Sequence, residues 1–229
     1  MWTTLFNDRR DAGERLGELL RPLGSSPGFV VVGLPRGGIP VAFEVASQIG
    51  APLDVCVVRK LGVPGHEEVA MGAIATGGVQ TLNATTIRGL HITPEAIRRT
   101  LDHERRELER RERTYRDGHP PVDVHGRTVI LVDDGLATGA SMTAAVTALR
   151  QRGPRAIVVA VPVASPSACA ELRHVADGCV CILTPEPFEG VGRWYADFSE
   201  TTDDEVRQLL AAARSRESAD AAEGVEYMV

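Results

Sequence analysis

The chain has few aromatic residues, few cysteines and no long uninterrupted hydrophobic run. Aromatic residues make up 4% of its 229 residues. No apolar stretch approaches the roughly 20 residues that a membrane-spanning helix needs. The first ten residues, Met1 to Arg10, lack the apolar segment of a secretory signal. We therefore expect a soluble, cytoplasmic protein.

The four cysteines, at positions 56, 169, 179 and 181, do not have the spacing that is typical of metal ligands. Cys56, Cys179 and Cys181 lie in apolar, strand-like runs. Reduced cysteines in such runs behave as small hydrophobic residues and are commonly buried. The sequence therefore predicts reduced core thiols.

An excess of basic charge is also missing. The formal net charge is -6 at pH 7, and 43% of the residues are hydrophobic, which is ordinary for a globular protein. Without a basic surplus, nothing in the composition suggests general binding to nucleic acids or to membranes. The length suits one sizeable domain, and we predict a single domain over residues 1–229.

Apolar, β-branched runs alternate with helix-like segments along most of the chain. The predicted strands are 29–33, 53–58, 129–132, 156–163 and 179–183. This alternation predicts an α/β fold with a central, mainly parallel sheet of about five strands and helices on both faces. A helix capped by Asn7 and reaching Leu20 is expected before the first strand.

Residues 61–120 interrupt the alternation. Two short strand-like runs flank Gly77-Gly78, a pattern that predicts a hairpin. Thr93 is a good N-cap for a long helix that reaches about Arg116. The apolar stripe along this helix is narrow, so it suits packing along one seam, either against a partner subunit or against the protein's own segment 184–200.

The segment from Val129 to Ser141 is the most informative part of the sequence. A buried strand ends at Asp133 and Asp134, and a glycine-bearing turn then leads into a helix. Backbone N–H groups at the start of a helix favour a phosphate, whereas two adjacent carboxylates suit neighbouring hydroxyls or a divalent cation. The nucleotide fingerprints GxGxxG and GxxxxGK[ST] are absent. The segment therefore predicts a site for a phosphorylated sugar, and the alternative is a plain turn whose acids cap a helix.

A second glycine-bearing turn, Leu34 to Pro40, follows the first predicted strand. Gly37 and Gly38 allow backbone N–H groups to approach a ligand closely, and Arg36 supplies a fixed positive charge. The alternative is a tight connector with a surface arginine. Because the carboxyl ends of parallel strands lie at one edge of a sheet, both turns are expected at the same edge.

The segment 129–141 resembles the phosphoribosyl pyrophosphate (PRPP) motif of type I phosphoribosyltransferases. The wider pattern, which includes Phe6-x-Asp8-Arg9 and Trp194-Tyr195-x-Asp197-Phe198, is similar to a group of bacterial predicted phosphoribosyltransferases. The resemblance implies the type I phosphoribosyltransferase fold. It also implies transfer of 5-phosphoribosyl from PRPP to a nitrogenous acceptor such as a nucleobase-like ring, with release of pyrophosphate and with Mg²⁺ as cofactor.

The same resemblance implies roles for individual residues. Asp133 and Asp134 would hold the ribose hydroxyls and lie near the Mg²⁺. The 5′-phosphate would be bound by Ala137, Thr138, Gly139, Ala140 and Ser141. The pyrophosphate would be bound by Arg36, Gly37 and Gly38, with Arg59 and Lys60 at the end of the second strand. The implied catalytic residues are Asp133, Asp134, Arg36 and Lys60.

Two details of the resemblance concern the loops. In the family, the loop 34–40 often holds a cis non-proline peptide, which here would fall near Pro35–Arg36 or Arg36–Gly37. The paired Arg59-Lys60 is also common at a solvated strand end, so its role stays open. The residues 61–120 match the position of a lid over PRPP.

Residues 184–200 match the position of a hood over the acceptor and hold four of the ten aromatic residues. Phe188, Trp194 and Tyr195 are candidates for stacking on the acceptor ring. An aromatic plug that packs the C-terminal helix on the sheet is an equal alternative. Ala137 replaces the third acid of the 6-oxopurine enzymes, which argues against hypoxanthine or guanine. Residues 215–229 are predicted to be frayed.

As partners we expect PRPP and a small-molecule acceptor, with a homodimer as the assembly and neither nucleic acid nor membrane. Two alternatives share the fold. A PRPP-binding regulatory protein would be expected to show a basic face or a DNA-binding appendage. A non-catalytic DNA-uptake-type accessory protein usually carries an N-terminal cysteine zinc module. Neither feature is visible in the sequence.

Overall fold

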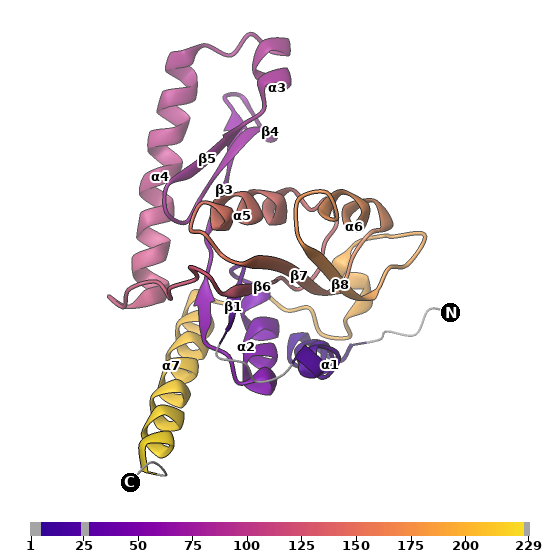
Figure 1. Cartoon of the computed structure of the whole chain (residues 1–229). Helices are drawn as coiled ribbons and strands as arrows, with labels where there is room; N and C mark the ends of the chain where they lie inside the picture. The colour runs from indigo at the N-terminus through magenta and orange to yellow at the C-terminus, as the bar shows by residue number, and fades with distance from the viewer. Residues whose placement is uncertain (1–5, 24–27, 227–229) are drawn as a thin grey trace.

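A computed structural model describes residues 6–23 and 28–226, with side chains as far as Ser218. Five parallel strands form a central sheet in the order β2–β1–β6–β7–β8 (Figure 1). These strands are β1 (Phe29–Gly33), β2 (Leu53–Val55), β6 (Thr128–Val132), β7 (Ala156–Val163) and β8 (Gly178–Leu183). The predicted α/β fold with a five-stranded parallel sheet is confirmed.

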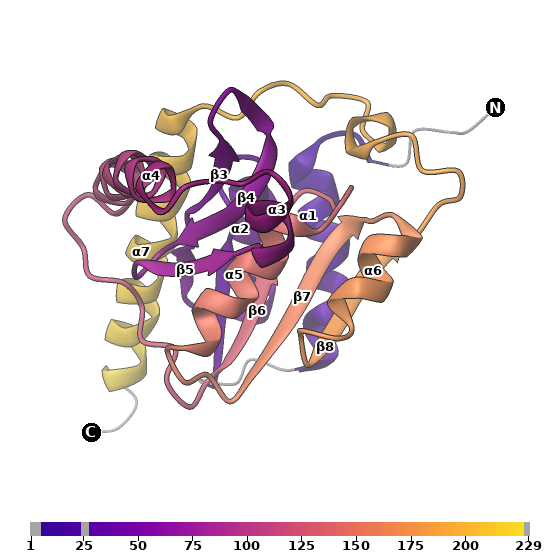
Figure 2. The ribbon, with the colours of Figure 1, turned by 90° about the horizontal axis from the view of Figure 1, so that it is seen from above.

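Both faces of the sheet are covered, which explains why β6 is apolar throughout. Successive side chains of a strand point to opposite faces. Val129 and Leu131 pack with α5 (Ala140–Arg150) and α6 (Pro166–Leu172). Ile130 and Val132 belong to the core on the other face. That face is covered by α1 (Arg9–Leu20), α2 (Gly38–Ile49) and α7 (Asp203–Glu226) (Figures 1 and 2).

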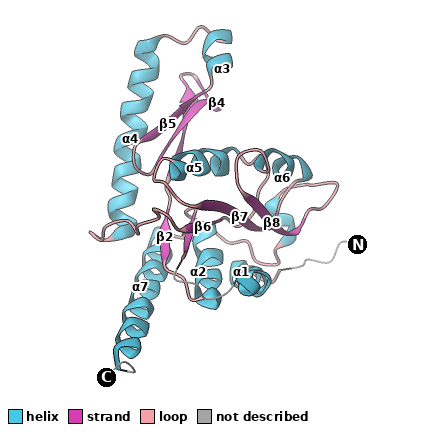
Figure 3. Ribbon diagram, viewed as in Figure 1, coloured by secondary structure: helices cyan, strands magenta, loops and turns pink. Residues whose placement is uncertain are grey.

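A second, antiparallel sheet stands beyond α5 in the order β3–β4–β5 (Figure 3). It consists of β3 (Val58–Val63), β4 (His66–Ala75) and β5 (Val79–Leu82), so the predicted hairpin around Gly77-Gly78 is confirmed and has a third strand. It is followed by α3 (Ala84–Gly89) and by α4 (Pro94–Arg116), which Thr93 caps as expected.

The apolar stripe of α4 packs against the protein's own chain. Leu101, Leu108 and Tyr115 are buried in the core that also contains residues of β3, β4 and α7. The Tyr115 hydroxyl donates a hydrogen bond to Asp203 at 2.7 Å. The helix thus packs within the chain against β3, β4 and α7, and neither of the two partners that the sequence leaves open is the one observed.

The predicted strand 53–58 is wrong in its length. β2 ends at Val55, and the Cys56 N–H donates to Gly33 O at 3.0 Å. The chain then leaves the parallel sheet, because Val57 N–H donates to the Thr76 hydroxyl at 2.8 Å. Arg59 and Lys60 therefore lie within β3 and not at the end of a parallel strand. The apolar run Val55–Val58 gives no local sign of this change of sheet.

The prediction of the first helix cap differs from the structure. Asp8, not Asn7, is the N-cap of α1, and its side chain accepts from Asp11 N–H at 2.8 Å. The last helix, α7, extends to Glu226. Within the described ranges, none of the helices combines the length and apolar character needed to cross a membrane.

Candidate active site

The loop after β1 contacts the acid pair that follows β6, at one edge of the parallel sheet. Asp133 and Asp134 follow β6, and the loop with Gly37 and Gly38 follows β1, which pairs with β6. A Cβ atom on Gly37 would lie 2.0 Å from Asp134 Oδ2, and one on Gly38 would lie 2.9 Å from the Asp133 Cα. The two glycines therefore allow a contact between loops that no side chain would permit. The Pro35–Arg36 peptide is cis, one of the two positions expected from the sequence.

This contact gives a first testable prediction. Gly37→Ala would push its methyl group into the Asp134 carboxylate, which is held by Arg9 and cannot move without losing that partner. We expect overpacking to cost about 1–3 kcal/mol in the free energy of unfolding. We also expect PRPP binding, measured by titration calorimetry with Mg²⁺ present, to weaken at least about tenfold, equivalent to 1.4 kcal/mol.

Gly89→Ala is the matched control, since a Cβ atom there would meet nothing within 4 Å. We expect this variant to unfold and to bind PRPP like the natural sequence. Equal behaviour of the two variants would contradict the close contact between the loops.

The turn after the acid pair lines a small cavity of about 160 Å³. Its lining comes from the acid-pair segment and from the segment before α7, and comprises Asp133, Gly135, Leu136, Ala137, Thr138, Gly139, Ala140, Ser141, Met142 and Val191. α5 begins at Ala140 after Gly139 in the left-handed conformation, with φ of 71°. The Ser165 hydroxyl donates to Ala137 O at 2.7 Å and fixes the turn from the side of α6. The five residues expected at the 5′-phosphate therefore share one cavity beside a helix N-terminus.

The acid pair is electrostatically costly in the absence of a partner. Burial raises the pKa of Asp133 well above its usual value, and the neighbouring Asp134 raises it further. Burial also raises the pKa of Asp134, against the effect of Arg9, whose Nε donates to Oδ2 at 2.8 Å. A bound cation or hydroxyl donors would offset this cost. Carboxylate oxygens are ligands that suit Mg²⁺, so the donor set fits the expected cofactor.

Arg9 is a site residue that our sequence reasoning did not identify. Besides Asp134, its guanidinium contacts Ser199 O at 2.6 Å and lies 4.0 Å from the centre of the Phe198 ring. The short sequence pattern Phe6-x-Asp8-Arg9 contains this residue, but nothing local indicates its partner. Arg9 also lies next to the glycine loop, because a Cβ atom on Gly37 would be 3.0 Å from its Nε.

Two segments that are distant in the sequence are joined next to the acid pair. Phe6 forms an isolated parallel bridge with Tyr195, and Phe6 N–H donates to Trp194 O at 3.1 Å. The Tyr195 hydroxyl donates to Asp134 O at 2.6 Å, and its ring lies 5.4 Å from that of Phe6 and 5.0 Å from that of Phe198. The buried Tyr195 ring is thus packed in an aromatic cluster that joins the N-terminal segment to the segment before α7.

The other two aromatic candidates surround that cluster. Phe188 and Trp194 are partly buried and pack against the core of Phe6 and Tyr195. Their segment also brings Val191 to the cavity lined by the turn 137–141. The structure therefore places the segment 184–200 beside the acid pair, and it leaves Phe188 and Trp194 more accessible than Tyr195.

The three basic residues named from the sequence are not gathered in one place. Arg36 lies in the cis-peptide loop, where it forms an ion pair with Glu200. Arg59 and Lys60 line a different cavity, of about 650 Å³, between β3 and α4. Arg59 Nε donates there to Glu104 Oε2 at 2.7 Å. Lys60, the only lysine in the chain, is exposed.

Comparisons with known proteins identify the family of this chain. The family model of the phosphoribosyl transferase domain matches residues 23–196. The Mycobacterium tuberculosis H37Rv protein named "Putative phosphoribosyl transferase Rv0571c" is 46% identical over 209 residues, which are 91% of this chain and 47% of that protein. The chain therefore spans about half the length of this relative and of its counterpart in a second strain of that species.

Two further comparisons concern a solved structure and an enzyme. TT1426 from Thermus thermophilus superposes with a TM-score of 0.80 at 46% identity, over 91% of this chain and 98% of that chain. A uracil phosphoribosyltransferase of Desulfitobacterium hafniense is 40% identical over only 57 residues, 25% of this chain and 27% of that enzyme. Since the family model covers well over half of its residues, this chain belongs to the phosphoribosyl transferase domain family.

Proposed function

We propose that the protein transfers the 5-phosphoribosyl group of PRPP to a nitrogenous acceptor and releases pyrophosphate. The observation that carries this proposal is the contact between the acid pair and the glycine loop. Gly37 and Gly38 lie against Asp134 and Asp133 so closely that a ligand at one loop is within reach of the other. PRPP has a diol between a phosphate and a pyrophosphate, and these three groups correspond to the acid pair, the turn 137–141 and the loop 34–40.

The reaction exchanges one bond for another at C1 of the ribose. The acceptor nitrogen forms a bond to C1 while the bond from C1 to the pyrophosphate oxygen breaks, and pyrophosphate leaves with the electron pair. Side chains need not form covalent bonds, so the protein would act by positioning and by electrostatic stabilisation. Asp133 and Asp134 would accept hydrogen bonds from the two ribose hydroxyls and would face the positive charge that develops on the sugar.

Arg36 and the turn 137–141 would hold the two ends of the substrate. Arg36 is 38% exposed in its side chain and is paired with Glu200, so an incoming pyrophosphate could replace that carboxylate. At the other end, the start of α5 offers N–H groups and a helix dipole to the 5′-phosphate. Arg59 and Lys60 would contribute only if the β3–β4 sheet brings them towards the pyrophosphate.

Mg²⁺ would be held mainly by oxygens of the substrate and by water, with Asp133 and Asp134 beside them. Bound there, the ion would neutralise charge on the pyrophosphate and make it a better leaving group. For the acceptor, Phe188 and Trp194 are the more accessible aromatic candidates, and a flat ring is the chemistry that they suit. Ala137 offers no side-chain acceptor to such a ring, so we propose an acceptor other than a 6-oxopurine.

The experiment that tests this function is a pyrophosphate-release assay with PRPP, Mg²⁺ and a panel of purines, pyrimidines and small amines. We expect release with at least one acceptor, and loss of release when Mg²⁺ is chelated. PRPP binding without turnover across the panel would instead favour a PRPP-binding regulatory protein. Absence of PRPP binding would contradict the proposed function altogether.

A further inference from the structure

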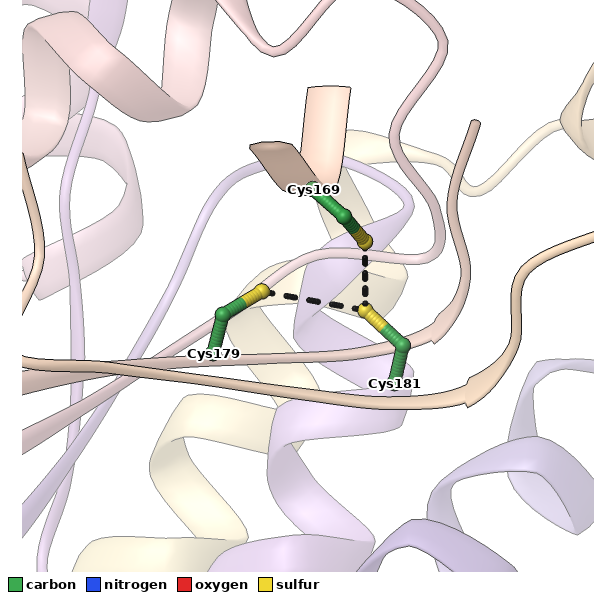
Figure 4. Close-up of side chains that lie close together, drawn as sticks. All are labelled: Cys169, Cys179 and Cys181. Carbon is green, nitrogen blue, oxygen red and sulfur yellow. Dashed lines mark hydrogen bonds between the residues drawn. The ribbon is translucent and has the colours of Figure 1, made fainter. Parts of the chain in front are cut away.

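Three of the four cysteines converge on one point, away from the acid pair. Cys169 lies on α6, and Cys179 and Cys181 lie two residues apart on β8, the edge strand that α6 covers. The Sγ atoms of Cys169 and Cys181 are 3.1 Å apart, and those of Cys179 and Cys181 are 3.8 Å apart (Figure 4). All three sulfurs lie within 4.8 Å of one another. Cys56, the fourth cysteine, is buried beside Thr76 and is not one of these three.

These sulfur–sulfur separations are close to those of thiolates that bind one metal ion. Sulfur atoms bound to one tetrahedral zinc ion at about 2.3 Å are about 3.8 Å apart. One pair of sulfurs already has this separation, and the closer pair would need to open by less than about 1 Å. A disulfide would use only two of the three sulfurs and would need a separation of about 2.05 Å. The convergence of the third thiol is therefore better explained by an ion than by a disulfide.

The metal ligand is the thiolate and not the thiol, so a bound ion would displace the thiol protons. Cys169 is buried whereas Cys179 and Cys181 are half-buried, so an ion has a path of entry.

We propose that Cys169, Cys179 and Cys181 form a thiolate site for a d¹⁰ metal ion, Zn²⁺ or Cu⁺. Soft thiolate ligands select these ions over Mg²⁺ and Ca²⁺. Three protein ligands leave one position for water on Zn²⁺, whereas three are sufficient for Cu⁺. On binding, the three thiols lose their protons to solvent and no electron is transferred.

Such an ion would fasten α6 to the edge of the sheet. It would thereby also stabilise the turn 137–141, which α6 supports. The Ser165 hydroxyl, at the N-cap of α6, donates to Ala137 O, and Ala168 lies 3.6 Å from the position of a Cβ atom on Gly139. The proposed role is therefore structural, and it stands whether or not the protein transfers phosphoribosyl groups.

The test uses the whole chain, purified under reducing conditions and stripped with a chelator. Titrations with Zn²⁺, and with Cu⁺ against a competing chelator, should each reveal whether one ion binds per chain, and the tighter of the two identifies the ion. Co²⁺ in place of Zn²⁺ should give a thiolate-to-metal charge-transfer absorption. We also expect the bound ion to raise the melting temperature, since it binds only the folded state.

Cys179→Ser and Cys181→Ser are the informative variants, because both positions are half-buried and serine preserves their size. Loss of a ligand should weaken binding more than about 100-fold, beyond the effect of changing an outer-shell partner. Cys56→Ala is the matched control and should bind like the natural sequence. Less than one ion per chain, or equal loss in Cys56→Ala, would overturn the proposal. So would a Cys169–Cys181 disulfide that forms in air with one equivalent of Zn²⁺ present.

Discussion

Asp133→Asn combined with Asp134→Asn is expected to abolish measurable PRPP binding at micromolar concentrations. Each carboxylate would accept a hydrogen bond from a ribose hydroxyl, and a hydrogen bond to a charged group contributes about 1.5–3 kcal/mol. Each single substitution should therefore weaken binding by about 10- to 100-fold, since 1.4 kcal/mol corresponds to a factor of ten. Titration calorimetry with PRPP and Mg²⁺ measures this directly.

The same substitution at Asp133 should make the unliganded protein more stable near neutral pH. Because burial and Asp134 raise the pKa of Asp133, the folded state binds its proton more tightly than the unfolded state does. Stability therefore falls as pH rises from the unfolded pKa through the raised folded pKa. Asparagine has no such penalty, so we expect Asp133→Asn to melt at a higher temperature at pH 7 and to lose this advantage below about pH 3.9.

A variant that binds PRPP more weakly but melts at a higher temperature has lost a carboxylate that serves binding and not folding. Asp102→Asn is a suitable control, because Asp102 is exposed on α4 and its carboxylate is 3.7 Å from Arg105. It should change neither the PRPP affinity nor the melting temperature. An Asp133→Asn variant that binds PRPP normally would contradict the assignment of the ribose site.

Arg116→Met is expected to give the largest loss of stability. Arg116 Nε and Nη2 donate to Asp54 at 3.1 and 3.3 Å, and Nη2 also donates to Val55 O at 2.7 Å. The two side chains are only 10% and 7% exposed. Removing the arginine leaves a buried carboxylate without its counter-charge, which costs about 3–5 kcal/mol. Urea unfolding should show this as a lower midpoint with an unchanged slope.

Arg113→Met provides the comparison within the same helix. Arg113 is exposed, and surface substitutions of this kind usually change the free energy of unfolding by less than about 0.5 kcal/mol. The double variant Arg116→Met, Asp54→Leu should recover part of the loss, because no unpaired charge remains. If Arg116→Met costs no more than Arg113→Met, the ion pair does not hold α4 to the parallel sheet.

The strands, the acid pair and the two glycine turns could be predicted because each depends on residues that are close together in the sequence. The β6 run, Asp133-Asp134 and the start of α5 lie within thirteen residues. Once the strands are parallel, their carboxyl ends share an edge, so the meeting of the loops 34–40 and 133–141 follows from topology. The cis peptide at Pro35–Arg36 followed from the resemblance of the loop to a known family.

Other features depend on contacts between distant segments and have no local pattern. The exit of the chain from the parallel sheet after Val55 is set by Thr76, which directly follows the last residue of β4. The residues before and after Val55 are equally apolar, because strands of both sheets are buried in the core. Sequence alone therefore predicted one strand and placed Arg59 and Lys60 at its end.

The sequence by itself determined the α/β class, the family and the residues that we propose for the phosphoribosyl site. Only the tertiary structure decided that Arg9 pairs with Asp134 across 125 positions, that Tyr195 is packed inside an aromatic cluster, and that three cysteines without metal-ligand spacing lie together. The physical reason is that a local run of residues fixes the conformation and the buried face of its own element. The side chains that meet between elements depend on how the whole set of elements packs.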